Sequence, residues 1–87
     1  MRSLFAAAFL LAAGPALAGP HCTDEPKSTW LSKAEMVEQI KADDYKISVF
    51  KVTSGRCYEI YGRDKNGRRV EVYFHPVTGQ AIRVRTR

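Results

Sequence analysis

The sequence predicts one small α+β domain in which a single N-terminal helix packs on a four-stranded antiparallel sheet. Three observations predict it: one amphipathic segment carries a helix-start signal, four short segments rich in β-branched and aromatic residues follow it, and turns containing Gly or Asn separate those segments. The expected domain spans residues 30–87, after a signal peptide at 1–18 and a polar leader at 19–29.

The first 18 residues have the pattern of a secretory signal peptide. Arg2 precedes an apolar run over residues 4–13, and Ala16–Leu17–Ala18 places small residues at the two positions that a signal peptidase reads. The apolar run is roughly half of the ~20 residues that a transmembrane helix needs. Cys22 also lies beyond the position that a lipoprotein signal requires. We therefore expect cleavage near Ala18, a periplasmic or secreted protein, and no stable membrane anchor.

The mature chain would be modestly basic. Cleavage would remove Arg2 and lower the formal net charge from +5 to +4. An excess of this size is typical of a solvated surface and permits weak attraction to anionic polymers. No block of like charges occurs, and no nucleic-acid-reading motif is present, so we expect no nucleic-acid partner.

Both cysteines would remain in the mature chain, in an oxidising compartment. Two cysteines allow one pairing, so we expect a Cys22–Cys57 disulfide that closes a loop of 36 residues. A redox or metal-binding pair is disfavoured, because the two cysteines lack CxxC spacing and no cluster of other ligands adjoins them.

The helix is expected to begin after Ser32. Glu35 follows at the capping-box spacing, and an apolar stripe continues from there, formed by Ala34, Met36, Val37 and Ile40. Asp43 and Asp44 would sit at the unfavourable end of the helix dipole, so the helix should end by Asp43. Trp30, just before the helix, is expected to cover the core rather than to stack on a ligand.

Four strands are expected after the helix. Residues 45–52 alternate with a slip that indicates either a bulge or a strand buried on both faces. Residues 57–63 and 68–75 alternate regularly, and a last strand at 80–85 should turn Ile82 and Val84 inward. Short turns rich in Gly, Asn and Pro join the strands, which predicts an antiparallel meander covered by the helix on one face.

Three stretches of this part of the chain resemble small stand-alone PepSY-like exported bacterial proteins. Residues 55–61, 64–74 and 76–79 follow the patterns G-x-CYE-[VI], D-x-[DN]-G-x-[RK]-VEVYF and P-x-TG of that family, and Cys22, Trp30 and Tyr45 match upstream. The resemblance covers nearly all of the mature chain and implies a PepSY-like fold. One position departs from it: His75 stands where the family usually has an aspartate, which would cap the following turn.

The resemblance implies a non-catalytic module, because PepSY-type domains occur in propeptides of thermolysin-like proteases and in envelope proteins, and are thought to inhibit or regulate proteases. We therefore expect no enzymatic activity, no cofactor, and binding to an unidentified envelope protein, for which a protease is one candidate. The contact surface would consist of exposed sheet residues, namely Tyr61, Arg69, Tyr73 and Arg83. The alternative is a cationic protein that associates electrostatically with anionic envelope polymers.

Two arrangements that could carry chemistry have simpler interpretations. Glu59 and Glu71 could form a paired-carboxylate site, but adjacent strands offer them cross-strand ion pairs with Arg63, Arg69 and Arg83. His21 would be the third residue of the mature chain, a position typical of square-planar Cu(II) or Ni(II) sites. Such a site needs a backbone N–H at the second residue, and Pro20 has none. We therefore expect neither catalytic residues nor metal ligands.

Overall fold

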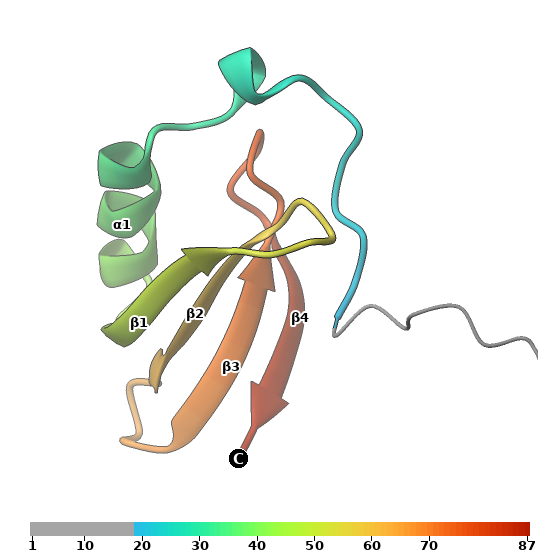
Figure 1. Cartoon of the computed structure of the whole chain (residues 1–87). Coiled ribbons are helices and arrows are strands. Elements are labelled where there is room, and N and C mark those ends of the chain that lie inside the picture. The colour runs from blue at the N-terminus through green and yellow to red at the C-terminus, as the bar shows by residue number, and fades with distance from the viewer. Residues whose placement is uncertain (1–18) are drawn as a thin grey trace, which may run out of the picture.

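The computed structural model describes residues 19–87, so the predicted signal peptide at 1–18 lies outside the described residues. The elements in chain order are a short 3-10 helix (Lys27–Thr29), α1 (Lys33–Ala42), β1 (Lys46–Val52), β2 (Tyr58–Arg63), β3 (Arg69–Phe74) and β4 (Ala81–Thr86). The strands form one antiparallel sheet in the order β1-β2-β3-β4, and α1 lies beside one face of it (Figure 1). The predicted α+β arrangement is confirmed. However, α1 is not the first element of the described chain, because the N–H groups of Thr29 and Trp30 close the 3-10 turn ahead of it.

Helix α1 begins as predicted with a capping box. The Ser32 hydroxyl accepts a hydrogen bond from the Glu35 N–H at 3.1 Å, and the Glu35 carboxylate accepts one from the Ser32 N–H at 2.9 Å. Met36 and Ile40 are fully buried, but Ala34 is exposed, because positions two apart point about 200° away from each other around a helix. Within residues 19–87, no helix is long and apolar enough to cross a membrane.

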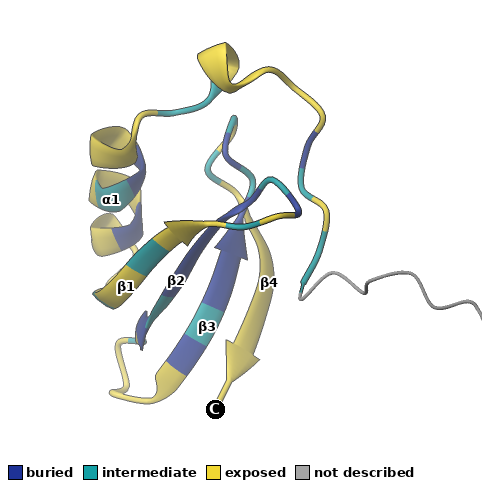
Figure 2. Ribbon diagram, in the orientation of Figure 1, coloured by how far each residue is buried: buried dark blue, intermediate teal, exposed yellow. Residues whose placement is uncertain are grey.

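The core lies between α1 and the sheet (Figure 2). The sheet contributes alternate residues of its two central strands, namely Tyr58, Ile60, Val70, Val72 and Phe74. Trp30 packs on the edge of this core, where its ring makes a T-shaped contact with Tyr58 at 5.4 Å and its indole N–H donates to the Glu25 carbonyl at 3.2 Å. Trp30 therefore covers the core, as expected.

Two bulges bend the sheet. The pairing of β1 with β2 shifts between Ile47 and Val49, which confirms a bulge in this strand. The pairing of β3 with β4 shifts between Tyr73 and Phe74. The expectation that Ile82 and Val84 point into the core is wrong, since these side chains are 45% and 51% exposed. Figure 2 shows the reason: β4 is the edge strand farthest from α1, so no layer covers it.

Candidate functional site

The face of the sheet opposite α1 carries acidic, basic and aromatic side chains. The strand register sets them in two neighbouring rows, one of Lys51, Glu59, Tyr73 and Arg83 and the other of Val49, Tyr61, Glu71 and Arg85. Because alternate residues of a strand share a face, the two rows form one continuous surface. We refer to it as the open face.

Two carboxyl groups meet in the middle of the open face. Glu59 is only 2% exposed, and the Tyr73 hydroxyl donates a hydrogen bond to Glu71 Oε2 at 3.1 Å. Burial, and next a side-chain hydrogen bond with Glu71, raise the pKa of Glu59 to about 7. The same hydrogen bond lowers the pKa of Glu71. Glu59 is therefore the carboxyl group of the pair that holds a proton close to neutral pH.

The ion pairs of these carboxylates differ from the predicted ones. Lys51 Nζ lies 3.7 Å from Glu59 Oε1, and Arg85 Nη1 lies 3.9 Å from Glu71 Oε1. The prediction that Arg63, Arg69 and Arg83 would pair with them is thus wrong about the partners. The register decides the outcome, because it sets Arg83 opposite Tyr73 and Arg85 opposite Glu71.

One oxygen of this cluster has no partner among residues 19–87. Glu59 Oε2 is buried and accepts no hydrogen bond there. A buried acceptor without a partner costs about 1–3 kcal/mol. The cluster therefore has one unused hydrogen-bond acceptor, and a positively charged donor would suit two adjacent carboxyl groups best.

Tyr73 does not belong to the exposed contact surface that the sequence predicts. Its side chain is 1% exposed, and the leader passes directly over its ring at Gly19. Strand alternation placed Tyr73 on the face away from the helix, which is correct, but it could not show that the leader returns to cover that face. Tyr61 remains partly exposed, with Lys51 Nζ 5.0 Å and the Arg87 guanidinium 5.4 Å from its ring centre.

Of the other three residues expected in the contact surface, Tyr61 and Arg69 form part of a basic area. Arg69 and Arg83 are exposed. Arg63 lies directly across from Arg69, and the Arg87 N–H donates to the Arg69 carbonyl at 2.8 Å, so three arginines converge at one end of the open face. They border a hollow of about 320 Å³ that also includes Tyr61. We call Tyr61, Arg63, Arg69 and Arg87 the basic surface; Arg83 lies farther along β4, opposite Tyr73.

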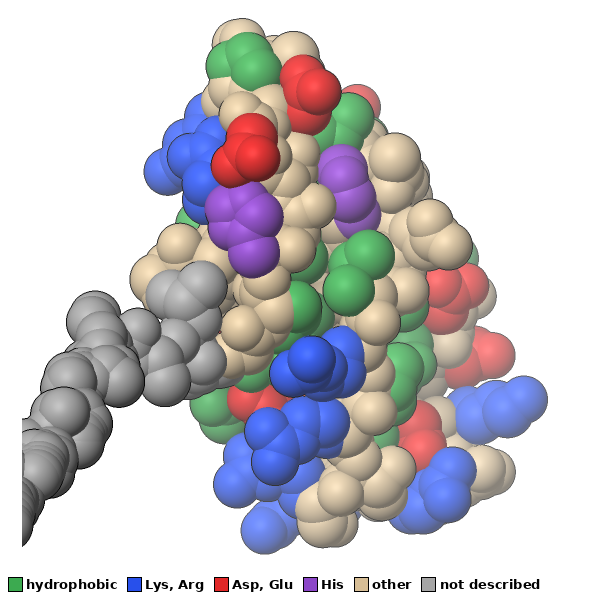
Figure 3. All heavy atoms as spheres, turned by 90° about the vertical axis from the view of Figure 1, so that its right-hand side faces the viewer, with side chains coloured by type: hydrophobic (Ala, Val, Ile, Leu, Met, Phe, Trp, Pro, Cys, Tyr) green, Lys and Arg blue, Asp and Glu red, His purple; other side chains and the backbone are tan. Residues whose placement is uncertain are grey.

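The basic surface is suited to bind anionic groups. Figure 3 shows Lys and Arg side chains gathered in the lower half of the face turned toward the viewer. Like charges in direct cross-strand register repel each other, as Arg63 and Arg69 do, so an anion placed between them would stabilise the arrangement. Guanidinium groups bind carboxylates and phosphates through two parallel hydrogen bonds.

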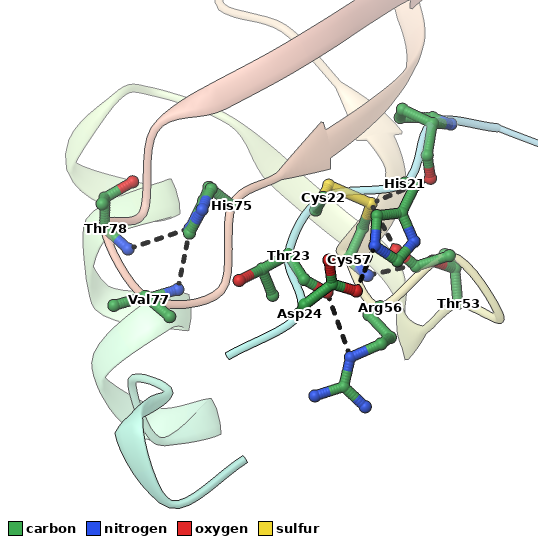
Figure 4. The surroundings of a disulfide bond; sticks show 12 residues. His21, Cys22, Thr23, Asp24, Thr53, Arg56, Cys57, His75, Val77 and Thr78 are labelled. Atoms are coloured by element: carbon green, nitrogen blue, oxygen red, sulfur yellow. Dashed lines mark hydrogen bonds and ion pairs between the residues drawn. A yellow bond between two sulfur atoms is a disulfide. The ribbon is translucent and has the colours of Figure 1, made fainter. Parts of the chain in front are cut away.

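A disulfide holds the leader on the sheet, as predicted. Cys22 and Cys57 are bonded (Figure 4). The Cys22 N–H donates to the Gly55 carbonyl at 2.8 Å. The Arg56 side chain reaches back to the Thr23 carbonyl at 3.1 Å. These contacts fix the path of residues 19–25 beside the turn that joins β1 to β2.

His75 caps the turn between β3 and β4. Its Nδ1 accepts a hydrogen bond from the Val77 N–H at 3.1 Å and lies 3.4 Å from the Thr78 nitrogen (Figure 4). A carboxylate at this position would accept the same N–H groups. His75 therefore replaces the aspartate that the resemblance leads one to expect and keeps its capping role.

Sequence reasoning did not pair Lys51 or Arg85 with the two carboxylates, and it did not place Gly19 over the open face. The two cations carried a usable signal, since strand alternation puts Lys51 on the same face as Val49 and Arg85 on the same face as Arg83. Gly19 carried none, because only the disulfide and the packing of the leader bring it over β3.

Comparison with known proteins identifies the family. A family model described as peptidase propeptide and YPEB domain (PepSY) matches residues 2–85, which is nearly the whole chain. The searches of curated proteins and of solved structures returned no match. PepSY domains generally act as propeptides or regulatory modules of proteases, and they are typically periplasmic or extracellular. On this match, the chain belongs to the PepSY family.

Proposed function

We propose that this protein is an exported, non-catalytic binding module that regulates an envelope protein, with a protease as the expected target. The family match supports a protease-related role, since the matching model describes peptidase propeptides. The observation that carries the proposal is the basic surface, where the exposed side chains of Arg63, Arg69 and Arg87 meet beside the partly exposed Tyr61 and form no direct ion pair among residues 19–87.

The chemistry of the basic surface defines the segment that it would bind. Arg63 and Arg69 lie directly across from each other on β2 and β3, so their guanidinium groups are neighbours. Tyr61 adds an amphipathic ring to the same hollow. Arginine and tyrosine are the residue types that most often dominate protein interfaces. An acidic segment of the partner, with carboxylates spaced to meet two arginines, fits this surface best.

The test is a crosslinking pull-down from envelope extract with the mature protein as bait, washed at low salt and at 1 M salt. We expect one protein to remain at high salt with the wild-type bait. The double variant R63A/R69A should lose it, whereas K65A, which removes a charge from the exposed β2–β3 turn, should keep it. A captured protease whose peptide-cleaving activity falls on addition of the pure domain would identify the regulated target.

A second candidate function is electrostatic association with anionic envelope polymers. It is favoured by the exposure of all of β4, which contains Arg83 and Arg85, and of Arg87 just after it. Exposed charge contacts weaken as the Debye length falls to about 3 Å at 1 M salt. If all bound material leaves every bait at 1 M salt, this second function is supported and the regulatory function is rejected.

A further inference from the structure

The leader brings Gly19 into contact with the centre of the open face. A Cβ atom at Gly19 would lie 2.6 Å from Tyr73 Cε2 and 2.8 Å from the Tyr73 hydroxyl oxygen, so a larger residue there would have to displace the Tyr73 ring. The backbone of Gly19 has a φ of +150°, which glycine adopts more readily than other residues. Because the Cys22–Cys57 disulfide and the Cys22–Gly55 hydrogen bond hold the next residues, this placement belongs to the fold.

Beneath Gly19 lies a site that lacks one donor. The Tyr73 hydroxyl is bonded to Glu71, the carboxyl groups of Glu59 and Glu71 interact, and Glu59 Oε2 is buried without a hydrogen-bond partner in the part of the chain that the structure describes. The nearest cation, Lys51, lies 3.7 Å from the other oxygen of Glu59, which is too far for a hydrogen bond.

We propose that this site binds the chain's own N-terminus: the α-ammonium group of Gly19, created when the predicted cleavage after Ala18 removes the signal peptide, forms an ion pair with Glu59 and Glu71. The cleavage is a hydrolysis in which water adds across the Ala18–Gly19 peptide bond. The carboxylate remains on Ala18 and leaves with the signal peptide. The Gly19 nitrogen becomes an ammonium group with three N–H donors.

The Gly19 nitrogen lies near this cluster. The nitrogen and the Cβ position of a residue are about 2.5 Å apart, because both are bonded to the same Cα. The Gly19 nitrogen therefore lies within about 5 Å of the Tyr73 hydroxyl, which is itself 3.1 Å from Glu71. A free terminus can rotate about its last bonds, so the ammonium group can turn toward the buried carboxylates once the preceding residues are gone.

The charges of the surrounding strands favour the same contact. The charged and titratable groups that face the site are Lys51 from β1, Glu59 and Tyr61 from β2, Glu71 and Tyr73 from β3, Arg83 and Arg85 from β4, and Arg87 just after it. Of these cations, Lys51 and Arg85 pair with the carboxylates only at 3.7 and 3.9 Å. An ammonium group at hydrogen-bond distance would let both carboxyl groups ionise together. The ion pair between the Gly19 ammonium group and these carboxylates would therefore form only after the signal peptide has been removed.

The experiment follows the titration of the N-terminus itself. The full chain is expressed and exported with ¹³C-labelled glycine, and the mature protein is purified. Mass spectrometry determines its first residue. NMR then follows the Gly19 signals as a function of pH. We expect Gly19 to be the first residue and its α-amine to have a pKa of about 9 or higher. The ordinary α-amine pKa is near 7.7, so the folded protein would bind this proton at least tenfold more tightly than a free amine does. E59Q should return the pKa to the ordinary range, and E25Q, an exposed leader residue, should not. An ordinary pKa in the wild type, or a mature chain that begins elsewhere, overturns the proposal.

A second measurement does not depend on the folding of E59Q. The α-amine of the mature wild-type protein is acetylated selectively, and unfolding by urea is compared between pH 5 and pH 7.5. With the amine blocked, no ammonium group offsets the burial of Glu59, and its pKa stays raised in the folded protein. Stability is then full below the ordinary value of 4.5 and falls as the pH rises through about 7. The free amine should abolish this fall, and identical pH profiles of the two forms would contradict the proposal. Neither result depends on the identity of a binding partner.

Discussion

The imidazole of His75 holds the β3–β4 turn through one ring nitrogen, Nδ1, which accepts the Val77 N–H. The H75A variant leaves this N–H without its acceptor and should lower the free energy of unfolding by about 1 kcal/mol. H75D should keep most of the stability, because a carboxylate accepts the same N–H groups. Urea unfolding at neutral pH measures both. H21A, which alters an exposed histidine, is the control and should change stability by less than about 0.5 kcal/mol. Equal loss in H75D and H75A would show that His75 does not cap the turn.

At the scale of single elements, α1 depends on its capping box. S32A removes the acceptor for the Glu35 N–H and should cost about 1 kcal/mol in thermal or urea unfolding. S54A in the exposed β1–β2 turn serves as the matched control and should have little effect. A cost in S54A as large as in S32A would mean that the loss does not come from the cap.

The capping box also makes a pH prediction. The backbone N–H of Ser32, and next its hydroxyl, lower the pKa of Glu35 below its ordinary value of 4.5. Because the folded value is the lower one, this contact stabilises the fold above about pH 4.5, and the gain disappears as the pH falls through the folded pKa. The E35Q variant should therefore lose less stability than the wild type between pH 5 and pH 3. Parallel acid-unfolding curves for the two proteins would contradict this.

The bulge in β1 makes a second prediction at this scale. Gly62 pairs with Ile47 next to the bulge, and a Cβ at Gly62 would collide with the Lys46 carbonyl oxygen. G62A must push β1 away from β2, so it should cost about 2 kcal/mol or more. The matched control is G67A, which has open space around it and only the cost of a positive φ, about 1 kcal/mol. Similar losses in the two variants would show that close approach of the strands is not the reason for glycine at position 62.

For the whole molecule, the disulfide is the largest single constraint. It joins residues separated by 35 positions and ties the leader to the start of β2. In the loop-entropy model, closing a loop of this length contributes on the order of 3–4 kcal/mol. The C22S/C57S variant should therefore unfold at a much lower urea concentration than the oxidised wild type, and its midpoint should not change on addition of reductant. A midpoint close to that of the oxidised wild type would mean that packing alone holds the leader on the sheet.

The parts of the fold that the sequence could predict are those held by contacts between neighbouring residues. Helix α1 between its caps Ser32 and Asp43, the bulge in β1 and the meander with its turns follow from contacts between residues close in sequence, so capping, alternation and turn chemistry were enough. The disulfide followed from a count of two cysteines. Ile82 and Val84 were placed wrongly, because their exposure depends on how far α1 extends across the sheet, which no local pattern contains.

The sequence alone therefore determined the elements, their antiparallel order, the covalent link and the family resemblance, because each of these is encoded by neighbours along the chain or by the identity of a few residues. Only the tertiary structure decided the open face. It showed that Tyr73 is buried, that Glu59 and Glu71 share an environment, and that Lys51 and Arg85 are their cations. The physical reason is that burial and ion pairing depend on strand register and on the return of the leader over β3, and both are set by contacts between residues distant in sequence.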